Sequence, residues 1–300
     1  MSKLEVDQID PQSGTTLTLG TSGDTVTIPS GVSLAPGGGL TLTGALAVDG
    51  GTVKLDGNYP TGTDNVALGD TALDSVEAGG INNVAIGDHA GTAITTGDSN
   101  IAIGKDALET STTASHNTAI GFEALNKNTT GCFNQAIGSF ALGCNTEGCQ
   151  NTAMGMSALI VNTTGDDNVA IGRLALTANT TANNNTAVGK SALAANTTAA
   201  DNTAVGKEAL LTNTTGACNT AIGVGALTAN TTAAENTSIG SASMLGNTTG
   251  TKNVAVGRCS LRCNTTADDN TAVGHASLFA NTTGTRNVAV GCGALAANTT

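Results

Sequence analysis

The chain has 300 residues, and Gly 40, Ala 46, Thr 51 and Asn 30 together make up 167 of them, whereas aromatic residues are 2% and the net charge is −12. So few large apolar side chains argue against a conventional enzyme core, and 39% hydrophobic with 11% charged residues argues against a disordered coil. The acidic charge disfavours nucleic acid as a partner. The sequence contains no run of about eighteen apolar residues, so it predicts no membrane-spanning segment.

Residues 1–60 contain short alternating segments, such as 16–19, 25–28 and 40–43, separated by turns rich in Gly, Ser and Pro. These segments predict short β-strands. Because such short strands rarely stand alone, we expect this segment to pair between chains or to attach to a partner. A simple cap on the following domain is an alternative interpretation. The first residues show no basic and apolar secretory leader.

From residue 61 onward the chain is dominated by a repeat whose first five residues read Asn-x-Ala-aliphatic-Gly, with one Ser in place of Ala. The anchoring Asn residues are 65, 83, 100, 117, 134, 151, 168, 185, 202, 219, 236, 253, 270 and 287. Every step is 17 residues except the first, which is 18. A short fixed period is typical of a solenoid, so we expect residues 61–300 to form fourteen stacked coils.

We number the anchoring Asn as repeat position 0, so that the unit reads N-[T/V]-A-[I/V]-G-x-x-A-L-x-x-N-T-T-[G/A]-x-x. Gly at position 4 and Asn-Thr-Thr at positions 11–13 would interrupt a helix in every unit. Positions 1–3 alternate as in a short strand with two different faces. The predicted fold class is therefore all-β, a parallel solenoid or β-roll in which each coil rises about 4.8 Å.

Identical repeat positions should form columns along such a stack. The Asn at position 0 is expected to form an amide ladder through Asn117, Asn134, Asn151, Asn168 and Asn185, with a second Asn column at position 11. The dry interior is expected to contain Ile120, Ile137 and Ile171 at position 3, and Leu125, Leu142 and Leu159 at position 8. Position 16 predicts an exposed ladder of alternating charge through Glu235, Lys252, Asp269 and Arg286.

The Ala at position 2 is expected to lie on the strand face opposite the aliphatic residue. Since such a small side chain permits close approach, we expect this face to mediate self-association, with three chains around one axis. The homotrimer is an expectation from packing, because the repeat itself does not determine the number of chains.

The sequence predicts no catalytic, cofactor-binding or metal site. The three His residues lie far apart along the expected rod, and the paired carboxylates lack a shaped cleft. The seven Cys residues are an odd number without a Cys-x-x-Cys motif. Cys132 and Cys149 share position 15 in adjacent coils, so a disulfide is conceivable, although free thiols in a reducing cytoplasm are the favoured interpretation.

Units such as 117–121 and 202–206 resemble the head repeats of YadA-like trimeric autotransporter adhesins, which fold as parallel β-rolls with three chains per head. The fuller unit, with Ala-Leu and Asn-Thr-Thr-Gly, looks more like shafts of bacteriophage tail fibres, and residues 1–31 are similar to the start of marine phage fibre proteins. The absence of a signal peptide, coiled-coil stalk and anchor departs from the adhesin pattern and favours the phage resemblance.

The resemblance implies a homotrimeric fibre assembled in the host cytoplasm and located on the virion. Residues 1–60 would bind tail or head proteins, and a distal tip would bind a host surface receptor. Because the chain stops at Thr300 without an atypical capping coil, we expect the natural protein to continue and to carry that tip. The alternatives are a bacterial surface adhesin, a free solenoid that binds ice through its Thr columns, and a tailspike-type enzyme.

Overall fold

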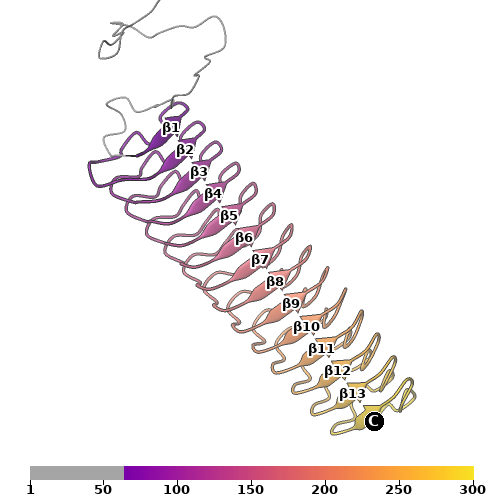
Figure 1. The fold of residues 1–300 in the computed structure, drawn as a ribbon. Coiled ribbons are helices and arrows are strands. Elements are labelled where there is room, and N and C mark those ends of the chain that lie inside the picture. Colours follow the sequence, from indigo (N-terminus) through magenta and orange to yellow (C-terminus); the bar gives the residue numbers. More distant parts are fainter. Residues whose placement is uncertain (1–63) are drawn as a thin grey trace, which may run out of the picture. The chain divides into compact units, whose positions relative to one another are not determined.

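The computed structural model describes residues 64–300, which form one elongated stack of coils with a single strand in each coil (Figure 1). The strands are β1 Val66–Leu68, β2 Val84–Ile86, β3 Ile101–Ile103, β4 Thr118–Ile120, β5 Gln135–Ile137, β6 Thr152–Met154, β7 Val169–Ile171, β8 Thr186–Val188, β9 Thr203–Val205, β10 Thr220–Ile222, β11 Thr237–Ile239, β12 Val254–Val256, β13 Thr271–Val273 and β14 Val288–Val290. Turns connect them, and the described residues contain no helix. This confirms the predicted all-β solenoid.

The strands pair in parallel and in chain order, so they make one continuous sheet of 14 strands along the stack. The register confirms the 17-residue coil, because Thr186 lies opposite Thr203 in the next strand. The 18-residue first step pairs Val66 with Val84. Asn65 reaches the carbonyl of Gly80, 15 residues away, whereas Asn83 reaches a carbonyl 14 residues away. The extra residue is therefore accommodated between positions 65 and 80.

Close stacking of the coils requires Gly at position 4, immediately after each strand. The φ angles there lie between 127° and 137° in all coils, a region that side chains disfavour. At Gly189, an added Cβ would lie 2.6 Å from the carbonyl carbon and oxygen of Gly206 in the next coil. The predicted positive φ at this position is confirmed. The structure adds three further left-handed positions per coil, at positions 6, 8 and 16.

The apolar core of most coils is made by two Ala residues and one Leu, with Gly91 or Met244 at the Leu position of two coils and Ser at an Ala position of three. In the coil of β4, Ala119 at position 2, Ala124 at position 7 and Leu125 at position 8 are all 0% exposed. The same holds at Leu142 and Leu159, so the predicted Leu column is confirmed. Each such Leu contributes about 2 kcal/mol through burial.

The predicted interior column at position 3 is wrong. Ile137 and Ile171 are each 38% exposed, and Ile120 is only partly buried, whereas the Ala between positions 1 and 3 is fully buried. In a strand, positions 1 and 3 share one face and position 2 lies on the other. The coil is so thin that the Leu at position 8 and the Ala at position 7 fill it, which leaves room only for a methyl group at position 2. The expectation that the Ala face mediates self-association is wrong for the same reason.

The Asn ladder at position 0 is confirmed. The backbone amide of Asn134 donates to Oδ1 of Asn117 at 2.9 Å, and the backbone amide of Asn151 donates to Oδ1 of Asn134 at 3.0 Å. Asn168 and Asn185 continue the pattern with the same distances of 3.0 Å. All five side chains are 0% exposed. The bonds between them therefore satisfy buried polar groups that water does not reach.

The second Asn ladder, at position 11, runs from Asn128 to Asn298 through side-chain amides alone. Nδ2 of Asn145 donates to Oδ1 of Asn128 at 2.8 Å and to the carbonyl of Gly148 at 2.9 Å. The link repeats every 17 residues up to the bond from Asn298 to Asn281. Chained bonds of this kind polarise one another in a low-dielectric interior, so the ladder favours one register of stacking.

The predicted β-rich attachment segment at residues 1–60 lies outside the described residues. Between residues 64 and 300 there is no helix of the length and apolarity that a membrane crossing would require.

Candidate functional site

The most extensive candidate site is the outward face of the sheet, which we call the strand face and define as repeat positions 1 and 3 of β1–β14. Position 3 carries Ile, Val, Leu or Met in every strand, and position 1 carries Val, Ile, Thr or Gln. No charged residue occurs at either position in the fourteen strands. Ile86, Ile137, Ile222 and Ile239 are between 36% and 39% exposed, so an aliphatic row follows the stack along its whole length.

The charged column at position 16 has the predicted register but forms only one of the expected ion pairs. Nε of Arg286 lies 3.8 Å from Oδ2 of Asp269, with the two side chains 84% and 45% exposed. Within residues 64–300, neither Glu235 nor Lys252 comes within 4.0 Å of an opposite charge. Long exposed side chains lose conformational freedom when they pair, so this column contributes little to stability.

Aromatic residues also meet across coils. His116 and Phe133, at position 16 of adjacent coils, stack with ring centroids 4.8 Å apart. Phe122 and Phe140 meet edge to face at 5.2 Å. These contacts show that the variable positions interact with the coil above or below, which the sequence analysis did not predict for the aromatic residues.

The thiols of Cys132 and Cys149 lie in adjacent coils, as their shared position predicted. The Sγ of Cys149 accepts from the backbone amide of Cys132 at 3.1 Å, and all seven cysteines are free. Burial raises the pKa of the Cys149 thiol, which reduces its thiolate fraction at neutral pH and therefore its reactivity.

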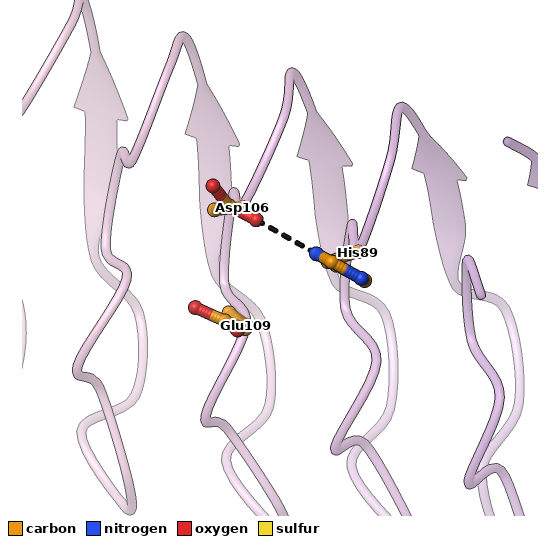
Figure 2. Close-up of side chains that lie close together, drawn as sticks. All are labelled: His89, Asp106 and Glu109. Atoms are coloured by element: carbon orange, nitrogen blue, oxygen red, sulfur yellow. Dashed lines mark hydrogen bonds and ion pairs between the residues drawn. The ribbon is translucent and has the colours of Figure 1, made fainter. Parts of the chain in front are cut away.

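A mixed cluster of His89, Asp106 and Glu109 was missed by the sequence analysis (Figure 2). His89 and Asp106 occupy position 6 of adjacent coils, and Glu109 follows three residues after Asp106. Their nitrogen and oxygen donor atoms all lie within 4.8 Å of one another, and all three residues are partly buried. The available signal was the 17-residue separation of His89 and Asp106, which places them side by side in the stack.

The cluster is bordered by two further charges. Nζ of Lys105 lies 2.5 Å from Oδ2 of Asp88 and 4.0 Å from Oδ2 of Asp106. The hydrogen bond from Lys105 lowers the pKa of the Asp88 carboxyl, and the same bond raises the pKa of Lys105. Lys105 is thus paired chiefly with Asp88, which leaves Asp106 and Glu109 as acceptors for other groups.

Comparison with known proteins adds no relative: no family model, no curated protein and no solved structure matches this chain. A fibre or adhesin role, which the similarity of its units suggests, is therefore a proposal.

Proposed function

We propose that this chain is a rigid structural shaft of a virion fibre, in which three copies associate side by side and hold a host-binding tip away from the particle. The observation that carries the proposal is the strand face of β1–β14, which points outward, is free of charge and has an aliphatic residue at position 3 of every strand. The resemblance of the repeats to phage fibre shafts supports the virion setting.

The stack has the mechanical character that a shaft requires. Each coil bonds only to its two neighbours, and both Asn ladders join successive coils through buried amides. Thirteen steps of about 4.8 Å give a rod roughly 60 Å long. The structural role is consistent with a chain that we do not expect to be an enzyme.

The strand face is also continuous, as association along the shaft requires. All fourteen strands pair in one sheet, so the aliphatic row at position 3 runs along the whole described stack. Soluble monomers rarely expose a long continuous row of large aliphatic side chains. A second and third copy of this chain are suitable occupants, because an identical face repeats with the same spacing.

Within the proposed fibre, residues 1–60 attach to head or tail proteins, and the receptor is bound beyond the shaft. Labelling virions and bacterial cells with antibodies and gold particles tests this setting by electron microscopy. We expect label on fibres that project from the particle. Label confined to bacterial envelopes would favour the adhesin alternative.

Self-association is tested by mass measurement of the whole chain in sedimentation equilibrium. We expect a trimer for the wild type and a monomer for the double variant Ile137→Lys/Ile171→Lys, because burying two ammonium groups in an apolar interface is unfavourable. The matched control is Thr164→Lys, an exposed position outside the strand face, which should remain trimeric. Circular dichroism should show the same β content in all three. A wild-type monomer would refute the association and leave the solenoid itself intact.

An ice-binding solenoid is the second candidate, and the Thr columns favour it. Thr164, Thr181 and Thr198 at position 13 are exposed in three successive coils, and Glu147 interrupts the row in the coil before them. At position 12, Oγ1 of Thr129 donates to the carbonyl of Thr146 at 2.9 Å, which fixes the neighbouring row. Thermal hysteresis of the purified protein would support this candidate, and its absence would exclude it.

A further inference from the structure

We propose that His89, Asp106 and Glu109 form a binding site for one divalent transition-metal ion, which joins the coils of β2 and β3 (Figure 2). The proposal is independent of the fibre function. One imidazole and two carboxylates form a donor set that suits zinc, cobalt and nickel.

The separation of the donor atoms matches a shared ion. Nδ1 of His89 lies 3.1 Å from Oδ1 of Asp106. Two ligands that each bind a metal at about 2.0–2.2 Å are separated by roughly 3 Å when they are neighbours in its coordination shell. One donor atom of Glu109 lies within 4.8 Å of the donor atoms of both other residues, so its carboxylate is close to an ion held between His89 and Asp106.

The backbone holds the two coils at a fixed spacing, so the ligands are brought together before the ion arrives. The amide of His89 donates to the carbonyl of Asp70 at 3.0 Å, and the amide of Asp106 donates to the carbonyl of Asp88 at 2.9 Å. Nδ2 of Asn126 donates to Oε2 of Glu109 at 2.7 Å, which restrains this carboxylate from the next coil. Restrained ligands lose less entropy on binding.

Asp88 lies on the other side of the imidazole ring, with its Oδ1 3.6 Å from Nε2 of His89. In the metal-free state Nδ1 donates its proton to Asp106. When the metal takes the Nδ1 lone pair, the neutral ring carries its proton on Nε2, beside the Asp88 carboxylate. A carboxylate next to the second ring nitrogen is the usual outer partner of a metal-bound His.

The charge of the surroundings also favours a cation. Asp88, Asp106 and Glu109 bring three negative charges, and Lys105 offsets one of them. Lys105 is held by Asp88, 4.0 Å from the nearest oxygen of Asp106, so it does not occupy the space between Asp106 and His89. A divalent ion would neutralise the remaining two charges.

The test is a titration of the full 300-residue chain with zinc chloride by calorimetry, followed by cobalt chloride with visible absorption. We expect one zinc ion per chain and a cobalt spectrum typical of nitrogen and oxygen ligands. His89→Ala should abolish both signals. Asp106→Asn, which keeps the shape of the side chain, should weaken zinc binding by at least about 10-fold.

Two variants separate this site from adventitious binding elsewhere. His116 stacks on Phe133, and His275 lies 3.8 Å from Sγ of Cys292. His116→Ala and His275→Ala should both retain one ion per chain with unchanged affinity. Equal zinc stoichiometry in His89→Ala and the wild type would overturn the proposal, as would loss of binding in His275→Ala. Circular dichroism of each variant distinguishes a lost ligand from a lost fold.

Discussion

The coils before residue 117 differ most consistently from those after it at repeat position 11, and the difference shows what the repeat requires. From Asn128 to Asn281, position 11 is a buried Asn that bonds to its counterparts. In the first three coils it is Val76, Ile94 and Ser111. The sheet, the first Asn ladder and the close Gly packing continue through both regions. The second ladder is therefore an addition to the fold, whereas the other features define it.

The coil of β2 shows how an apolar residue replaces the ladder. Its position 8 is Gly91 rather than Leu, and its position 11 is Ile94, which is 1% exposed. A Cβ on Gly91 would lie 3.0 Å from Cδ1 of Ile94 and 3.1 Å from Cδ2 of Leu73. Ile94 thus supplies the apolar volume that Leu supplies elsewhere. The His89, Asp106 and Glu109 cluster lies in these same coils, so the less regular region combines altered packing with local chemistry.

The largest expected effect comes from breaking a feature that both regions share. Gly189→Ala places a Cβ against the Gly206 carbonyl at φ 135°, and we expect a loss of about 4 kcal/mol or more in the free energy of unfolding. Chemical denaturation followed by circular dichroism measures the loss. Gly293→Ala is the matched control, because its φ is 66° and nothing lies within 4 Å of the added Cβ. The control should lose only about 1 kcal/mol. Equal effects would mean that the close approach of coils is not what requires Gly.

The next effect breaks only the regular region. Asn196→Ala removes bonds to Oδ1 of Asn179 and to the carbonyl of Ala199, and deprives Nδ2 of Asn213 of an acceptor. Since these groups are buried, we expect a loss of about 2–4 kcal/mol in unfolding free energy. Native-state hydrogen exchange should show the loss centred on the coils on either side.

Thr197→Ala provides the control for that variant, because it removes one partly buried bond from the adjacent position. We expect a loss of about 1 kcal/mol. A loss as small at Asn196 would contradict a stabilising role for the second ladder.

Much of the fold was predictable because the 17-residue period is visible within one chain. Fixed positions such as Asn117 and Leu125 correspond directly to a ladder and a core column, and the period alone places them in register. Which face of each strand points into the coil was not predictable in the same way. Alternation shows that Ala119 and Ile120 lie on opposite faces, but hydrophobicity assigned the larger side chain to the interior. The interior of the coil is too narrow for the larger side chain, so Ala119 is buried and Ile120 lies on the outer face.

The candidate sites were less predictable for a different reason. The strand face could not be recognised from the sequence, because its aliphatic residues at position 3 were expected to lie in the core. The cluster at His89 depends on side chains that converge from adjacent coils, and the repeat gives their spacing without giving their directions. Neighbours at a separation of 17 residues, such as His89 and Asp106, can be compared in any solenoid once the period is known.

The smallest effect extends the regular region by one coil. Ser111 lies directly before Asn128 in the column, and its buried Oγ has no hydrogen-bond partner. Ser111→Asn would let Oδ1 accept from Nδ2 of Asn128 and let its own Nδ2 donate to the carbonyl of Ala114. We expect a gain of about 1 kcal/mol in unfolding free energy, measured by chemical denaturation. Ser111→Ala, which only removes the unsatisfied hydroxyl, should give a smaller gain. If Ser111→Asn destabilises the chain, Ile94 in the coil before leaves no room for an amide, and the second ladder ends at Asn128 for that reason. The residue tolerated at position 11 then depends on its neighbours in both adjacent coils.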